Sequence, residues 1–143
     1  MIVFTNYFAV QDLTGLVAVG PPAGKLNGAK MGLYKTQIVP SRDTTLSDLT
    51  PCDFAGYALS AAITWDVPFL DVNDVATVLG SMVSFVAGST PPLNPQSVYG
   101  YYIVDAAGTD LLALEAFDAP RGISAPGNTI AIVPQVQAVS QTG

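Results

Sequence analysis

Residues 99–117 read Tyr99-Gly-Tyr-Tyr-Ile-Val-Asp-Ala-Ala-Gly-Thr-Asp-Leu-Leu-Ala-Leu-Glu-Ala-Phe117, and this stretch decides the expected fold. Two runs rich in aromatic, β-branched and aliphatic residues flank the segment 105–110, in which Gly108 can adopt a positive φ without steric cost. Such runs, joined by a short segment that contains glycine, are typical of a β-hairpin. We therefore expect residues 99–117 to form a hairpin.

The same β pattern recurs about every ten residues from Lys30 onward, with turn residues between the runs. Within residues 59–67, Ile63 and Trp65 fall on one face of an extended chain and Thr64 falls on the other, which is the alternation of a half-buried strand. Trp65 is therefore expected to anchor the core. The expected strands are Met31–Val39, Leu59–Val67, Val75–Leu79, Met82–Ala87, Tyr99–Asp105, Leu111–Phe117 and Thr129–Val139.

Prolines and glycines mark the places where these strands should stop. Pro134 cannot donate to a ladder, so the last run lies at a sheet edge, is bulged, or consists of two shorter pieces. A helical turn is expected from Thr50 to Gly56, because Pro51 suits the first position of a helix and Thr50 can cap it.

The chain also divides near residue 30. Residues 1–29 hold a short apolar lead, a mixed stretch and a Gly/Pro-rich linker at 20–24, and their pattern leaves helix, strand and extended arm open. Residues 30–143 are expected to form one all-β domain, because short β runs separated by glycine and proline turns characterise that class.

The composition removes most enzyme mechanisms. The chain has 143 residues, no histidine, one cysteine and one glutamate, and half of its residues are hydrophobic. Hydrolytic, acyl-transfer and metal chemistry near neutral pH usually depends on histidine, a cysteine thiolate or a tuned carboxylate pair. We therefore expect no enzymatic activity, no cofactor and no catalytic residue.

Charge is scarce, and this bears on the partners. The net charge is −6, and 11% of the residues are charged, whereas an average soluble domain has about 25%. Five scattered basic residues do not suit nucleic-acid binding. A membrane span needs about 20 apolar residues in a row, and no run approaches that length. The N-terminus lacks the pattern of a signal peptide, so export by that route is not expected and an intracellular site of synthesis is. A surface so poor in charge suggests a hydroxyl-rich coat or contact with neighbours.

Two segments have a faint similarity to ligand-binding motifs. Residues 20–25 are similar to a phosphate-binding loop, but the spacing is one residue short and Leu26 stands where a Ser or Thr should be. Residues 71–74 carry Asp and Asn oxygens, but Ala76 and Met82 stand where a calcium loop needs Gly and Glu. We interpret both segments as connections and expect no metal site.

Several single side chains could be functional or structural. Cys52 has no histidine to activate it, so a buried thiol is expected. Tyr99, Tyr101 and Tyr102 could form a platform that contacts sugars or proteins. In a strand, however, Tyr99 and Tyr101 share one face and Tyr102 takes the other, so at least one of the three is expected in the core. By the same parity Glu115 should face solvent or a partner, while Leu112 and Leu114 point inward.

A set of short segments resembles small structural proteins of tailed bacteriophage virions. The resemblance covers residues 30–138 and lies in scaffold positions, so it transfers no functional residue. Its segments are Lys30-Met-Gly-Leu-Tyr-Lys35, Pro40, Thr44-Thr-Leu-Ser-Asp-Leu-Thr50, Asp53-Phe-Ala-Gly-Tyr57, Tyr99-Gly-Tyr-Tyr102, Asp105-Ala-Ala-Gly108 and Phe117.

The resemblance implies a capsid cement or decoration protein with a β-sandwich or jelly-roll domain. It further implies a homotrimer that contacts the major capsid protein, in a virion assembled in the host cytoplasm. The alternative is a tail or fibre module that recognises host glycans through the tyrosine-bearing hairpin, and a hydrolase with an aspartate pair is a third hypothesis. Many copies on the shell would support cement, whereas few copies at the tail would support the receptor module.

Removal of residues 1–29 is predicted to leave the β domain folded and to weaken assembly, because an extended terminus that orders on a neighbour adds buried surface to the contact. Occupancy of the truncated protein on capsids measures this effect. Unchanged occupancy would contradict the prediction.

Overall fold

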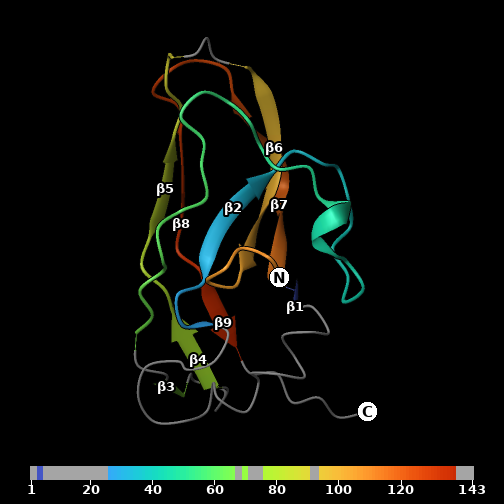
Figure 1. Cartoon of the computed structure of the whole chain (residues 1–143), viewed down its shortest axis with the longest axis vertical. Helices are drawn as coiled ribbons and strands as arrows, with labels where there is room; N and C mark the ends of the chain where they lie inside the picture. The colour runs from blue at the N-terminus through green and yellow to red at the C-terminus, as the bar shows by residue number, and fades with distance from the viewer. Residues whose placement is uncertain (1–2, 5–25, 67–68, 71–75, 91–93, 138–143) are drawn as a thin grey trace.

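The computed structural model describes residues 3–4, 26–66, 69–70, 76–90 and 94–137, and strands dominate these residues (Figure 1). The all-β class is therefore confirmed. No helix in these ranges is long and apolar enough to cross a membrane. The elements are β1 (Val3–Phe4), β2 (Lys30–Tyr34), the 3-10 turn η3 (Leu46–Asp48), β3 (Phe69–Leu70), β4 (Ala76–Leu79), β5 (Val83–Val86), β6 (Gln96–Val104), β7 (Leu111–Ile123), β8 (Thr129–Ile132) and β9 (Gln135–Gln137).

The main sheet has the order β1-β7-β6-β2, with antiparallel pairs throughout. Its centre is the predicted hairpin of β6 and β7, which is confirmed. Asp105 holds the turn, because its Oδ1 accepts hydrogen bonds from the backbone N–H groups of Thr109 (2.9 Å) and Asp110 (3.2 Å). Gly108 has φ 76°, as its position in the sequence predicted.

Two smaller sheets, β3-β4-β9 and β5-β8, complete the described strands. The runs predicted at 75–79 and 82–87 correspond to β4 and β5. Pro134 separates β8 from β9, so the last predicted run is two shorter pieces. The proline still contributes its carbonyl oxygen, which accepts a hydrogen bond from the Gly80 N–H at 2.9 Å.

The strand predicted at 59–67 is wrong. This segment runs beside β2, where Ser60 N–H donates to Met31 O (2.9 Å) and Ile63 N–H donates to Ala29 O (2.8 Å). Three residues on one side thus match two on the other, and this mismatch prevents a regular ladder. The alternation of burial was read correctly, since Ile63 and Trp65 are buried and Thr64 is exposed.

Two other boundaries differ from the sequence prediction. The strand expected at 31–39 ends at Tyr34, where the chain leaves the sheet. The helical turn expected at 50–56 is wrong, because Pro51 forms a β-bridge with Tyr34 and Gly56, with φ 85°, lies in a tight turn. The helical turn is instead η3, where Thr45 and Asp48 form a capping box.

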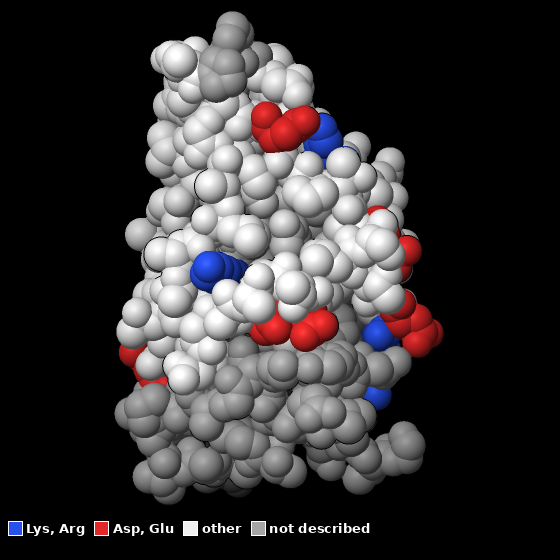
Figure 2. Space-filling model, in the orientation of Figure 1, with Lys and Arg blue, Asp and Glu red and all other residues white. Residues whose placement is uncertain are grey.

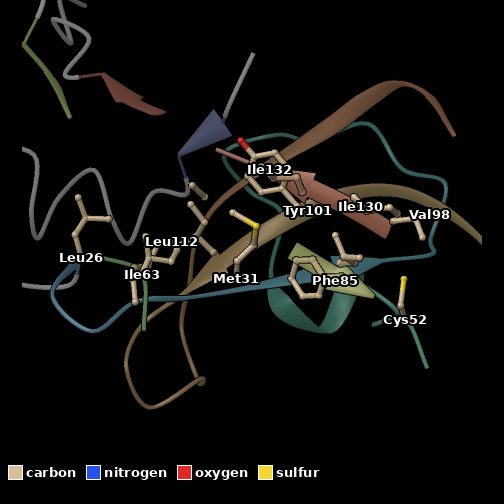
Figure 3. Close-up of a cluster of buried hydrophobic side chains, with 14 of the residues drawn as sticks. Leu26, Met31, Cys52, Ile63, Phe85, Val98, Tyr101, Leu112, Ile130 and Ile132 are labelled. Atoms are coloured by element: carbon tan, nitrogen blue, oxygen red, sulfur yellow. The ribbon is translucent and has the colours of Figure 1, made fainter. Parts of the chain in front are cut away.

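The main core contains apolar side chains from all three sheets, and Figure 3 shows part of this cluster. Trp65 belongs to it, as predicted, and its indole N–H donates a buried hydrogen bond to Leu26 O at 2.9 Å. Other members are Met31, Leu33, Cys52, Val78, Phe85, Tyr101, Ile103, Leu112, Ile130 and Ile132.

Residues before Lys30 contribute to this core. Leu26 and Ala29 are almost completely buried in it, and β1 pairs with β7 at the far side of the main sheet. The division of the chain near residue 30 stays a prediction. A deletion that tests the arm should end before Leu26, because removing Leu26 also removes the acceptor of the Trp65 indole.

A second, smaller cluster lies beneath the loop formed by residues 36–49, which includes η3. The ends of this loop are held together, since Lys35 N–H donates to Thr50 O at 2.9 Å. Its residues Leu46 and Leu49 pack against Tyr34, Tyr102, Val104, Leu111 and Leu114 of the main sheet. Side chains from β2, β6 and β7 are therefore buried in both clusters.

The second cluster depends on two glycine–tyrosine pairs between β2 and β6. Gly32 lies opposite Tyr102, and Tyr34 lies opposite Gly100. A Cβ atom at Gly32 would overlap the Tyr102 ring, and one at Gly100 would overlap the Tyr34 hydroxyl and the Glu115 carbonyl oxygen. Each glycine thus provides the space that the opposite tyrosine occupies.

An irregularity in β7 changes which side chains share a face. Ile103 pairs with Ala113 while the next residue, Val104, pairs with Leu111, so Leu112 is an extra residue in the ladder. Leu112 consequently lies in the main core and Leu114 in the second cluster. Both point inward as predicted, but toward different clusters.

Gly32→Ala is predicted to destabilise the fold by about 1–3 kcal/mol, the usual cost of overpacking a buried site. Gly122→Ala is the matched control, because a Cβ there meets nothing within 4 Å. Denaturant unfolding of both variants measures the difference. In a Tyr102→Leu background the added cost of Gly32→Ala should shrink, and an equal cost in both backgrounds would contradict the pairing.

Candidate interaction surface

The only thiol of the chain is built into the core. Cys52 is 3% exposed, and burial raises the pKa of its thiol to about 12. Lys35 lowers this pKa slightly, but its effect is smaller than that of burial. Since the thiolate is the nucleophilic form, Cys52 is unreactive in the folded protein. The prediction of a buried thiol is confirmed.

The tyrosine platform is wrong, whereas the expectation that at least one of these tyrosines lies in the core is confirmed. Tyr101 and Tyr102 are each 4% exposed, and Tyr99 is partly buried against the second cluster together with Tyr102. Tyr101 instead belongs to the main core, so Tyr99 and Tyr101 do not share a face as expected. The register of β6 against β7 shifts between Val98 and Gly100, and the simple alternation fails there.

Tyrosine hydroxyl groups form hydrogen bonds inside the fold. The Tyr57 hydroxyl accepts from Leu33 N–H (3.1 Å) and lies 3.5 Å from the Tyr102 hydroxyl. The Tyr34 hydroxyl donates to the Glu115 backbone oxygen at 3.3 Å. Burial raises the pKa of Tyr34 to about 12, and the Glu115 charge makes a smaller contribution. Burial is also the largest cause of the raised pKa of Tyr57 and of Tyr101.

Glu115 does not simply face solvent. Its side chain is half-buried, and its charge raises the pKa of both Tyr34 and Tyr101. A side-chain hydrogen bond to Glu115 also contributes to the shift at Tyr101. The carboxylate is therefore part of the sheet's own packing.

A polar cluster surrounds Asp53. Its Oδ1 accepts hydrogen bonds from Lys35 Nζ (2.8 Å), Gln96 Nε2 (2.8 Å) and Asn94 Nδ2 (3.1 Å). The Asp53 backbone N–H in turn donates to Gln96 Oε1 at 2.8 Å. These bonds, first that of Lys35 and then that of Gln96, lower the pKa of Asp53. The cluster joins the segment after Pro51 to the start of β6, and we interpret its role as structural.

Within the described ranges, no group of three or more Asp, Glu, Cys or His side chains is placed to hold a metal ion. The segments 20–25 and 71–74, whose sequences are faintly similar to ligand-binding motifs, both lie outside those ranges.

The exposed apolar side chains point to a different kind of site. Met82, Val86 and Val133 are 64%, 53% and 56% exposed, and they lie in or next to the paired strands β5 and β8. Met82 and Val133 immediately flank the Val83–Ile132 pair. The inward residues of these strands, Phe85, Ile130 and Ile132, pack in the main core.

We define the outer face of β5–β8 as the surface formed by Met82, Ser84, Val86, Thr129, Ala131 and Val133, all of which are exposed. It contains apolar and hydroxyl groups and no charge. The sequence around it is equally neutral, because residues 75–104 and 122–143 contain no Asp, Glu, Lys, Arg or His. Figure 2 accordingly shows the strip of surface over β5 as white, with charged side chains gathered elsewhere.

Sequence reasoning placed these strands but missed this face. In residues 82–86 both alternating sets contain apolar residues, so period-2 alternation cannot say which set is exposed. The signal that could have indicated this face is the distribution of charged residues along the chain. Residues 75–104 and 122–143, which include both strands, carry no charge.

A comparison of the chain with protein-family models, curated proteins and solved structures gives no match. The function is therefore argued from the residues of the chain itself.

The buried hydroxyl and thiol groups predict a loss of stability at alkaline pH. In an unfolded chain Cys52 and Tyr34 ionise near 9.0 and 10.0, while the folded protein holds their protons to about 12. The unfolded state therefore releases protons first, and the free energy of unfolding should fall as pH rises from about 9 to 12. Urea unfolding across this range measures the fall. Tyr34→Phe should make it shallower, and an unchanged slope would contradict the assignment.

Proposed function

We propose that this chain is a non-enzymatic structural protein of a tailed-phage virion that binds the capsid shell and stabilises it, as cement or decoration proteins do. The observation that carries the proposal is the outer face of β5–β8, an exposed and uncharged surface on two paired strands. The resemblance of residues 30–138 to virion structural proteins points the same way.

Surface chemistry favours this role over catalysis. A protein that stabilises a shell acts by burying surface against its neighbours. Apolar surface releases about 25 cal/mol per Å² on burial, whereas a charge must find a partner or lose solvation energy. A face made of Met82, Val86, Val133 and small or hydroxyl-bearing residues gains the energy of apolar burial. It contains no charge that would lose solvation energy.

The proposed occupant of this face is the major capsid protein, and the proposed assembly state is a homotrimer within the virion. For the fold we propose a β-sandwich, in which the main sheet forms one layer and the sheets β5-β8 and β3-β4-β9 form the other. Support for the two layers comes from the main core, where Met31, Leu33 and Ile103 of the main sheet cluster with Val78, Phe85 and Ile130 of the smaller sheets.

The glycan-binding alternative has lost the surface on which it depended. Tyr101 and Tyr102 are buried, and Tyr99 is partly covered, so the described hairpin offers no aromatic platform. We therefore retain the shell-binding role as the single proposal.

Electron microscopy of the native particle tests the proposal directly. Density for this chain in many equivalent copies on the shell is the expected result. A few copies at the tail, or none on the particle, would contradict it.

Met82→Asp is predicted to weaken shell binding by about tenfold or more, because it places a charge within a neutral contact. The folding stability should change by no more than about 0.5 kcal/mol, since Met82 is exposed. Ala107→Asp adds the same charge at an exposed position in the β6–β7 turn and should bind normally. Equal occupancy of the two variants on particles would contradict the assignment of this face.

A further inference from the structure

The turn that leads into β2 contains the dipeptide Asn27-Gly28. Asn27 is exposed, Gly28 has φ 79°, and Ala29 N–H closes the turn by donating to Leu26 O at 3.1 Å. A Cβ at Gly28 would lie 3.0 Å from the Ala106 Cβ, and its φ would be strained for any other residue. The fold therefore requires glycine after Asn27.

We propose that Asn27 is a site of spontaneous covalent modification, and that its isoaspartate form loosens the Trp65 anchor of the core. In the first step the backbone nitrogen of Gly28 attacks Cγ of Asn27, the Cγ–N bond of the side-chain amide breaks, and ammonia leaves. Water then opens the resulting succinimide at either carbonyl, giving aspartate or isoaspartate. The only co-reactant is water, and glycine favours the attack because it has no side chain to obstruct it.

The other asparagines in the described part of the chain lack these conditions. Asn94 precedes Pro95, whose nitrogen carries no hydrogen and cannot form the succinimide. Asn128 precedes β-branched Thr129, and its Oδ1 accepts hydrogen bonds from Ser124 N–H (2.9 Å) and Ala125 N–H (3.0 Å), which hold the side chain in place. Among the three asparagines in the described residues, the reaction should therefore be selective for Asn27.

The position of the turn gives the modification a structural effect. Leu26 O accepts the Trp65 indole N–H at 2.9 Å, and Ala29 O accepts the Ile63 N–H at 2.8 Å. These two acceptors lie on either side of Asn27 and Gly28, and both of their donors belong to the short segment 63–65. Isoaspartate adds one atom to the main chain between the acceptors, whereas aspartate adds only a charge. The longer chain cannot keep both hydrogen bonds in their present register.

The first test is ageing of the folded full-length protein in mildly alkaline buffer, followed by peptide mass mapping. The expected result is the mass gain of an NH₂-to-OH exchange at Asn27, with Asn94 and Asn128 unchanged, and its loss in Asn27→Gln. A folded protein whose Asn27 stays intact, over an interval in which the urea-denatured chain converts, would overturn the proposal.

The second test separates chain length from charge. Because the chain has one tryptophan, its fluorescence reports on Trp65 alone. The isoaspartate fraction, purified by chromatography, should show red-shifted emission and faster quenching, whereas Asn27→Asp should keep the native spectrum. A native spectrum for the isoaspartate fraction, or an equal shift in Asn27→Asp, would overturn the link between the turn and the Trp65 anchor.

Discussion

Two tyrosine rings can occupy one face of the main sheet because a glycine stands opposite each of them. The sequence Gly-x-Tyr occurs at 32–34 in β2 and again at 100–102 in β6, and antiparallel pairing sets each glycine against the other strand's tyrosine. The rings fill the space above the glycines and provide the surface on which Leu46 and Leu49 pack. Without the two rings the 36–49 loop would keep only Val104, Leu111 and Leu114 as the buried apolar side chains of the sheet beneath it.

The features that could be predicted from sequence are local ones. The hairpin follows from two β runs and Gly108, the burial of Trp65 from alternation, and the burial of Cys52 from the lack of an activating group. The sequence predictions were wrong where pairing between distant segments determines strand formation and the face of a side chain. Residues 59–67 alternate like a strand but meet β2 out of register, and Tyr99 and Leu112 lie near irregular pairing between β6 and β7 that alternation cannot anticipate. The β5–β8 face was missed because both sets of its alternating residues include apolar side chains.

Several polar and titratable side chains of the described residues are used inside the fold. The Cys52 thiol, the Tyr34 hydroxyl and Glu115 are used in packing, and the Asp53 carboxylate fastens two segments. The charges are confined to two regions of the sequence, which leaves β4, β5, β8 and β9 without any. A fold that uses these polar groups internally and has one neutral sheet face supports the proposed shell-binding role, which depends on the area of contact.

The 36–49 loop has a further consequence for use of the protein as a scaffold. Its ends are fixed by the Lys35–Thr50 hydrogen bond and by the pairing of Tyr34 with Pro51, while Val39 near its tip is 89% exposed. Additional residues at such a tip cost little closure entropy, because the cost grows only with the logarithm of loop length. The position between Val39 and Pro40 thus offers a place to present a foreign peptide, provided that Leu46 and Leu49 stay packed against Tyr34 and Tyr102.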